Sequence, residues 1–306
     1  MTTGVVVMAY GTPSDPDDVE RFYLDVRRGR PPSPEQLADL KRRYDAIGGT
    51  SPLNARTAAQ VAALQRALEV LEPGGYLVAY GAKHSAPKIE AAVTELAGRG
   101  VREVVGVVLA PHYSRLSVGE YLERAGERCA ELGLTCGFVR HWHDEEALIA
   151  ALAGRVREAA AALAPARGEI EYCFTAHSLP ERILAEGDPY PDELAETARL
   201  VAARLRLPHY RIGWQSAGRT PEPWIGPDIL VMLRELAAQG VGGVVVCSAG
   251  FTADHLEVLY DLDIEAAQLA AALGLAFSRT ASLNDDPAVF AGLAKRVAAA
   301  RPASAR

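Results

Sequence analysis

The sequence predicts an α/β protein with two similar domains, each a parallel sheet flanked by helices. Short apolar runs alternate with alanine-rich amphipathic stretches along the chain, which is the pattern of strands and covering helices in parallel sheets. At 306 residues the chain suits two domains of about 150 residues each. The two halves also resemble each other where their first strands end. Together these observations favour two related domains facing one cleft.

The expected strands are short runs rich in valine, isoleucine and aromatic residues, as in sheets that are buried on both faces. They lie at residues 5–9, 76–80, 104–109, 137–140, 170–175, 210–214 and 244–248. The main helices are expected at residues 55–71, 147–163, 194–205 and 288–300. The segment 140–145 is the expected crossover, so the domains are residues 1–143 and 144–306. An alternative for the last helix of the chain is that it packs back on the first domain.

The two halves carry matching residues at the ends of their first strands. Residues 7–13 (VMAYGTP) and 174–180 (FTAHSLP) both give a strand end, then alanine, an aromatic residue, a small residue and a proline. Ligands in open α/β sheets bind beyond the carboxyl ends of the strands. We therefore expect Tyr10 and His177 to approach one cleft from opposite sides.

Three acidic residues recur at intervals of four in the second half of the chain. Glu257, Asp261 and Glu265 would lie above one another on a helix, and residues 235–278 contain no lysine or arginine to neutralise them. Like charges at this spacing cost an isolated helix roughly 0.2–0.5 kcal/mol per pair. An acidic ladder without basic partners, together with His177 at the end of another strand, indicates a site for a metal cation.

These residues also have structural alternatives. Asp254 and Glu257 have the spacing of a capping box, which would explain those two residues but neither Asp261 nor Glu265. A histidine at a strand end, such as His177, is often a hydrogen-bonded structural residue.

Other motifs in the sequence favour fewer conclusions. The run His141-Trp142-His143-Asp144 has donors that suit zinc, but the sequence offers no evident third or fourth ligand. The glycines at 240–243 precede a strand instead of coming after one, so they do not form a dinucleotide-binding fingerprint. The chain also has neither a Walker A sequence nor a G-x-S-x-G motif.

The charge distribution points to an anionic ligand. The net charge of −7 argues against a general nucleic-acid binder. Residues 21–43 nevertheless contain seven basic residues against three acids. This basic segment is either a solvated face or a surface that receives an anion.

The sequence also bears on the compartment. The N-terminus lacks a basic region leading into a long apolar run, and the longest uncharged stretch contains four glycines, so we expect neither a secretory signal nor membrane insertion. The four cysteines form no C-x-x-C pair and are expected to be reduced and structural, which fits the cytoplasm.

The motifs of this chain closely resemble those of ferrochelatases, which insert ferrous iron into a porphyrin, and in particular the soluble coproporphyrin-type enzymes of heme synthesis. The matching stretches run in order over nearly the whole chain. They are VMAYGTP at 7–13, VRRGR at 26–30, RY at 43–44, IGG at 47–49, SPL at 51–53, APH at 110–112, AHSLP at 176–180, GWQS at 213–216 and DHLEVLYD at 254–261.

The resemblance implies two Rossmann-like domains of the chelatase type, with the active site in the cleft between them. It implies that His177 and Glu257 are the catalytic and iron-binding pair, and that Asp261 and Glu265 form a metal relay leading to it. Tyr10 matches a proximal ligand to the inserted iron. The positions implied to contact the porphyrin are Tyr10, Arg27, Arg43, Tyr44, Ser51 and Tyr121.

The expected reaction is insertion of Fe²⁺ into coproporphyrin III with release of two protons. Iron is then a substrate and no prosthetic group is expected. Some relatives bind an iron–sulfur cluster through C-terminal cysteines, but no cysteine follows Cys247. Arginine binds carboxylates with two hydrogen bonds, so the basic segment suits the four propionates of coproporphyrin better than the two of protoporphyrin. We expect a cytoplasmic monomer that binds no nucleic acid and passes coproheme to a downstream enzyme.

Three alternatives stay open at this level. The first is a protoporphyrin IX ferrochelatase, and the second is a chelatase for another tetrapyrrole such as sirohydrochlorin. The third is a porphyrin or heme carrier without catalysis, which would need the arginines and Tyr10 but not the acidic ladder. A metal-insertion assay separates the carrier from the enzymes.

Overall fold

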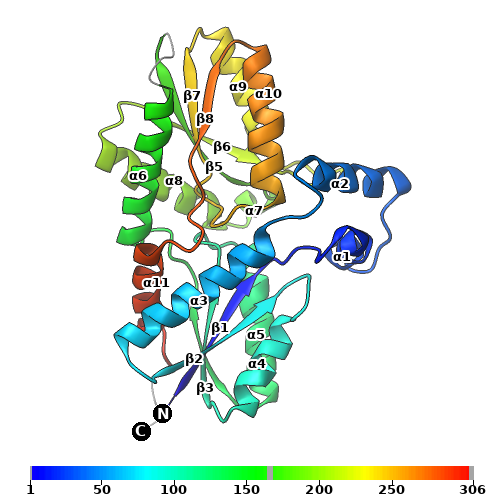
Figure 1. Cartoon of the computed structure of the whole chain (residues 1–306), viewed down its shortest axis with the longest axis vertical. Helices are drawn as coiled ribbons and strands as arrows, with labels where there is room; N and C mark the ends of the chain where they lie inside the picture. Colours follow the sequence, from blue (N-terminus) through cyan, green and yellow to red (C-terminus); the bar gives the residue numbers. More distant parts are fainter. Residues whose placement is uncertain (1, 164–167, 303–306) are drawn as a thin grey trace.

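The computed structural model describes residues 2–163 and 168–302, and two four-stranded parallel sheets form the framework of this part of the chain (Figure 1). The strand orders are β2-β1-β3-β4 and β6-β5-β7-β8, so the two domains repeat one topology. The strands are β1 (Thr3–Ala9), β2 (Tyr76–Ala82), β3 (Glu103–Val108), β4 (Thr135–Val139), β5 (Ile170–His177), β6 (Arg211–Gln215), β7 (Gly243–Cys247) and β8 (Ala276–Arg279).

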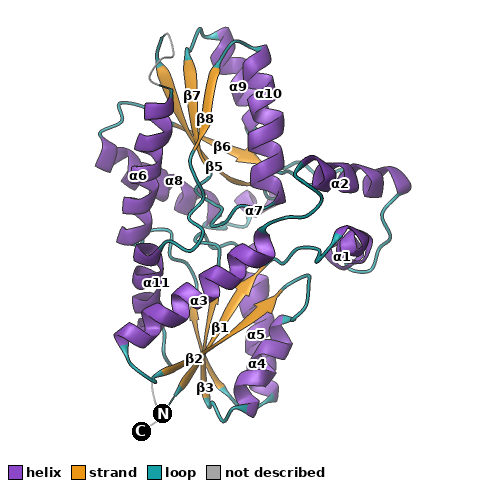
Figure 2. Ribbon diagram, in the orientation of Figure 1, coloured by secondary structure: helices purple, strands orange, loops and turns teal. Residues whose placement is uncertain are grey.

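Helices connect the strands and cover both faces of each sheet (Figure 2). The chain forms η1 (Pro16–Asp18), α1 (Val19–Val26), α2 (Pro34–Ala46), α3 (Leu53–Leu71), α4 (Ile89–Gly98), η2 (Arg115–Gly119), α5 (Glu120–Glu131), α6 (Glu146–Ala162), α7 (Arg182–Ala185), α8 (Tyr190–Leu205), α9 (Ile229–Ala238), η3 (Val258–Ala266), α10 (Ala267–Ala272) and α11 (Pro287–Ala299). Both η2 and η3 are π-helices, and each comes after the third strand of its domain.

One hydrophobic core runs through both domains. In the first domain α3 and α11 pack on one face of the sheet and α4 and α5 on the other; in the second, α6 and α8 lie opposite α9 and α10. The core shared by the domains is built from α3, α11, α6, α8 and the sheet faces they cover. The last helix, α11, packs against α3 of the first domain and crosses it, although the two are far apart in sequence (Figure 1).

The α/β fold with two similar parallel-sheet domains is confirmed. All seven expected strands are present with ends that differ by at most two residues. The eighth strand, β8, is absent from the sequence-based prediction. It is a half-buried edge strand of four residues, and its serine and arginine interrupt the apolar run that marks the other strands. The predicted boundary at residues 143 and 144 falls between β4 and α6.

The prediction of four reduced cysteines is wrong for one pair. Cys129 near the end of α5 and Cys136 in β4 form a disulfide, because the turn through Gly133 brings their Cα atoms within 6.5 Å. Cys173 and Cys247 are free and buried in the central strands of the second sheet. Among the described residues, no helix combines the length and apolar character needed to cross a membrane.

Candidate functional site

A cavity of about 410 Å³ opens where the carboxyl ends of the two sheets face each other. The loops after β1 and β3 line it from the first domain, and the end of β5 and the loop after β7 line it from the second. Helices α1 and α2 project from the side of the molecule at the level between the sheets (Figure 1), and both contribute to the wall. The predicted site residues that line this cavity are Tyr10, Tyr44, Ser51, Tyr121, His177 and Glu257.

His177 is the last residue of β5, the strand that corresponds to β1 in the repeated topology. Its Nδ1 is hydrogen-bonded to the carbonyl oxygen of Ser178, and its own carbonyl oxygen accepts from the Tyr190 hydroxyl at 3.0 Å. The ring is therefore fixed with Nε2 pointing to Glu257, whose Oε1 lies 3.6 Å away. Because Nδ1 carries the proton in this arrangement, Nε2 is the nitrogen that is available to bind a cation.

Glu257 lies between two histidines. Its second carboxylate oxygen, Oε2, is 3.6 Å from Nε2 of His255, a residue that the sequence analysis does not assign to the site. Burial alone would raise the pKa of Glu257, but the facing His177 and His255 lower it below its usual value. Burial would lower the pKa of His177, and Glu257 raises it overall. Without a cation, the site therefore favours an imidazolium–carboxylate pair.

The capping-box alternative for Asp254 and Glu257 is wrong. The carboxylate of Asp254 accepts from Ser282 Oγ at 2.8 Å and from Asn284 Nδ2 at 3.0 Å, and it lies 3.4 Å from Arg279. Both of its oxygens are used away from the helix start. Glu257 directs its side chain at the two histidines, so capping does not explain its presence.

The rest of the acidic ladder lies on the π-helix η3. Asp261 is buried; Ser216 Oγ donates to its Oδ2, and Arg43 Nη1 lies 3.5 Å from its Oδ1. Burial and the charge of Glu257 raise the pKa of Asp261 to about 7. Glu265, one further step along η3, is half-buried. The ladder thus has a basic partner after all, and it comes from α2, more than two hundred residues earlier in the chain.

The opposite wall of the cavity is aromatic. Tyr10 packs against His84 with ring centroids 4.6 Å apart. The Tyr44 hydroxyl and Thr12 Oγ1 share a hydrogen bond of 3.3 Å, and burial raises the pKa of Tyr44 to about 12. Burial also raises the pKa of Tyr121 well above its usual value, and the Lys83 ammonium lies 5.1 Å from its ring. Flat, apolar surfaces edged with hydroxyl groups suit a large planar ligand.

Two predicted porphyrin-contacting arginines lie outside the cavity wall. Arg43 is held by Asp261 and Asp39 and packs over the ring of Tyr260 at 4.8 Å. Arg27, at the end of α1, lies over the ring of Tyr23, which does line the cavity.

Several arginines of the basic segment already form ion pairs with carboxylates of the protein. Arg21, Arg28 and Arg42 each have a carboxylate partner. In the described part of the chain, Arg27 and Arg30 have no carboxylate within 4.0 Å. Each donates its Nε–H to the backbone carbonyl of the other, and the remaining N–H groups of the two guanidinium groups are available to an anionic ligand beside α1.

Two domains of one topology, joined at a cavity with a histidine–glutamate pair, define a chelatase-type protein. The fold is similar to that of SirB from Bacillus subtilis, with a TM-score of 0.59 at 11% identity, covering 97% of this chain and 95% of that chain. It is also similar to CbiX, the terminal enzyme of siroheme biosynthesis in denitrifying bacteria, with a TM-score of 0.52 at 16% identity, covering 97% and 99% of the two chains.

The ferrochelatase family model matches residues 2–301, so the chain belongs to the ferrochelatase family. A ferrochelatase of Herpetosiphon aurantiacus is 44% identical over 96% of this chain and 97% of its own length. The coproporphyrin III ferrochelatase of Anoxybacillus flavithermus is 46% identical over 95% and 94% of the two chains. That of Bacillus subtilis is 44% identical over 95% of each.

Proposed function

We propose that this chain is a coproporphyrin III ferrochelatase, a lyase-class enzyme that inserts Fe²⁺ into coproporphyrin III and releases two protons in heme biosynthesis. The observation that carries the proposal is the pair of His177 and Glu257 on one wall of a cavity whose other wall presents Tyr10. Curated relatives of similar length bear this name. A planar ring between these walls would have its nitrogens exposed to the metal-binding pair on one face and to the phenol on the other.

The porphyrin itself resists metallation, because its ring is rigid and two of its nitrogens carry protons. A ring bent out of plane exposes nitrogen lone pairs to the metal, and binding energy from remote groups can supply that distortion. In this cavity the aromatic wall around Tyr10, Tyr44 and Tyr121 would hold the ring. Arg27 and Arg30 would bind propionates at the edge. Distortion is therefore assigned mainly to Tyr44, Tyr121 and the two arginines, which do not face the reacting nitrogens.

His177 and Glu257 would act on iron and protons. Iron approaching Nε2 of His177 needs a neutral imidazole, so the proton of the imidazolium leaves as iron arrives. Glu257 as the carboxylate, and His177 once its imidazole is neutral, each have a lone pair that is suited to take a pyrrole proton. Asp261 and Glu265 on η3 would exchange the water ligands of iron for carboxylate oxygens on the way in. Iron is a substrate in this scheme, and no prosthetic group takes part.

Substrate choice rests on charge. Arg27 and Arg30 are the guanidinium groups without a carboxylate partner near the cavity in the described part of the chain, and a tetra-anionic porphyrin gains more from them than a di-anionic one. Protoporphyrin IX is the second candidate substrate, because the apolar wall accepts its ring equally well.

The test is anaerobic incubation of the purified chain with Fe²⁺ and either porphyrin, monitored by loss of free-porphyrin fluorescence. We expect insertion into both, with a higher kcat/KM for coproporphyrin III. A higher kcat/KM for protoporphyrin IX would refute the substrate assignment and leave the ferrochelatase reaction standing. Porphyrin binding without insertion would instead support the carrier alternative.

A further inference from the structure

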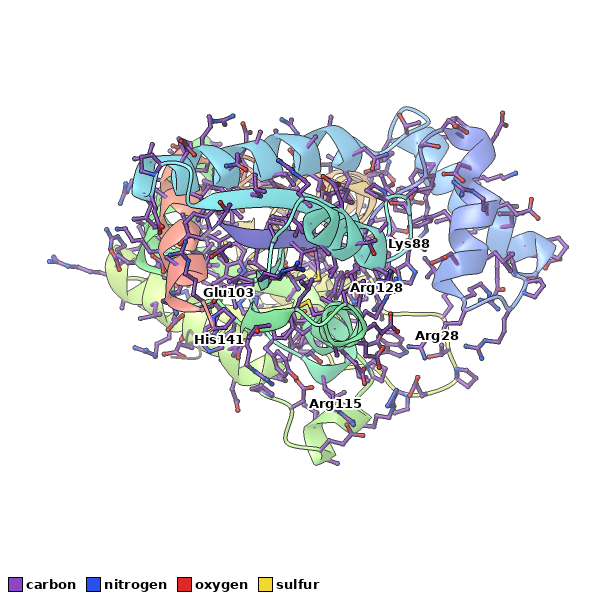
Figure 3. All side chains as sticks on the ribbon, turned by 90° about the horizontal axis from the view of Figure 1, so that it is seen from below. Arg28, Lys88, Glu103, Arg115, Arg128 and His141 are labelled. Atoms are coloured by element: carbon purple, nitrogen blue, oxygen red, sulfur yellow. A yellow bond between two sulfur atoms is a disulfide. The ribbon has the colours of Figure 1, made fainter. Side chains whose placement is uncertain are left out.

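A second group of metal-binding side chains lies outside the proposed iron site. One donor atom each from His141, His143 and Asp144 lies within 4.8 Å of the others. These residues form the crossover between β4 and α6, and Trp142 between them anchors the segment through a hydrogen bond from Nε1 to the Val108 carbonyl oxygen at 3.1 Å. In the view from below, His141 lies on the opposite side of the first domain from Arg28 (Figure 3).

Two of the donors are buried without a hydrogen-bond partner. His143 is only 4% exposed, and its Nδ1 has no partner; Nδ1 of His141 is also buried and lacks one. Buried polar atoms are rarely left without a partner, and such an atom in a native structure needs an explanation such as a water molecule or an ion. The sequence alone offers no further ligand for this run. The nearby Glu193 on α8 is a charge neighbour and not a member of this donor group: its Oε2 lies 3.3 Å from His143 Nδ1 and accepts a hydrogen bond from the backbone N–H of Tyr113.

A simple ion pair explains only part of this arrangement. A protonated His143 would satisfy Glu196, which lies 3.1 Å from Nε2, and would lie near Glu193. In that account His141 has only a distant pairing with Asp144, whose Oδ1 lies 3.9 Å from Nδ1, although the His141 ring centroid is 4.9 Å from that of His143 and its Nδ1 is buried. Arg296 donates a hydrogen bond to Asp144 Oδ1 at 2.9 Å and so orients this carboxylate. Residues that bind a metal are commonly held in place by such hydrogen bonds from residues that do not touch the metal.

We propose that His141, His143 and Asp144 form a second binding site for a divalent cation of the zinc type, with a water molecule as the fourth ligand. Two imidazole nitrogens and one carboxylate oxygen, with water in the fourth position, are donors that Zn²⁺ and Co²⁺ accept in tetrahedral sites. Bonds of about 2.0–2.2 Å place tetrahedral donors about 3.4 Å apart, so the present side chains need to close by roughly 1 Å.

The site is separate from the iron-binding pair, so its test does not depend on the proposed function. The protein to use is the full chain with His177→Ala and Glu257→Gln, which removes the proposed iron-binding pair from the cavity. After treatment with a chelator, bound Zn²⁺ is measured by competition with a chromophoric chelator. We expect one equivalent of zinc to remain bound, and Co²⁺ in its place to give the visible absorption of a tetrahedral ion.

Adding His141→Ala should then lower zinc affinity at least tenfold. His209→Ala is the matched control, because His209 is 41% exposed against 42% for His141 and also lies near carboxylates; it should leave the affinity unchanged. Zinc binding that is absent before His141→Ala, or equal after it, would overturn the proposal. If the cavity variant fails to fold, the same comparison in the unaltered chain must show a loss of one equivalent with His141→Ala.

Discussion

Replacing Glu257 by glutamine should abolish most iron insertion while the protein stays folded. Glutamine keeps the size of the side chain and removes its charge. The carboxylate lies 3.6 Å from His177 and from His255. A charge pair near this distance is worth about 4 kcal/mol at the effective dielectric of a protein surface. Glu257 and His177 are both 34% exposed, so water screens the pair to the order of 1 kcal/mol. We therefore expect a shift of only a few degrees in thermal unfolding.

The effect on catalysis should be larger. A group that binds iron or accepts a proton in the reaction contributes roughly 10²-fold or more, or about 2.7 kcal/mol of barrier. The assay is kcat for Fe²⁺ insertion at saturating coproporphyrin III, with porphyrin affinity measured separately by fluorescence quenching. The pKa of His177, measured by NMR, should fall, because Glu257 is the group that raises it. Glu265→Gln makes the same chemical change on the same stretch of helix and is the control.

The outcome that contradicts this reasoning is specific. If Glu257→Gln turns over at a rate near that of the unaltered chain, the glutamate is not needed for binding iron or for proton transfer. A capping role would not explain the presence of Glu257 either, because its capping partner Asp254 is hydrogen-bonded to Ser282 and Asn284 instead. Equal losses of iron insertion with Glu257→Gln and Glu265→Gln would assign both residues to iron delivery. The distinct catalytic role of Glu257 beside His177 would then be refuted.

Three other variants and one pH dependence test the same geometry. His177→Ala should lose insertion to a similar degree but still quench on binding porphyrin; loss of porphyrin binding would contradict it. Arg27→Ala should raise KM for coproporphyrin III severalfold with little change in kcat, and equal effects on protoporphyrin IX would argue against a role in choosing propionates. Tyr10→Met should still insert iron but alter the absorption spectrum of bound product, and an unchanged spectrum would place Tyr10 outside the coordination of iron. Asp261 has a pKa raised to about 7, so it is protonated below that pH and charged above it; KM for Fe²⁺ should rise as pH falls through 7, and Asp261→Asn should remove that part of the pH dependence.

The sequence predicts the site residues that depend on local position in the chain. Tyr10 and His177 come directly after apolar runs typical of central strands, and parallel strands direct their carboxyl ends to one edge. Glu257 and Asp261 are indicated by a spacing of four residues. The apolar runs and the spacing of the acidic residues identify these positions, and both patterns can be read from the sequence without knowing which residues are neighbours in space.

Features that depend on distant partners are not predictable in this way. The basic segment and the family resemblance assign Arg43 to the porphyrin, yet the fold brings it to Asp261 across the two domains. The position of His255, two residues before Glu257, suggests opposite sides of a helix, whereas the helix begins only at Leu256. The disulfide likewise depends on how tightly the turn between Cys129 and Cys136 closes.

The position of Arg43 changes how the acidic ladder works. Without a basic residue nearby, three carboxylates in a row would hold iron tightly and slow its release to the next ligand. Arg43 lies 3.5 Å from the middle carboxylate and favours its ionised form, but burial and the charge of Glu257 outweigh it and raise the pKa of Asp261 to about 7. Asp261 therefore carries only part of its charge at neutral pH, and the Arg43 guanidinium offsets that part. The ends of the ladder differ: Glu257 stays ionised between two histidines, and Glu265 is more accessible to water than Asp261. On the proposed path for iron, a cation would therefore meet a weak middle site and a strong last one, which would favour transfer toward His177 over retention on η3.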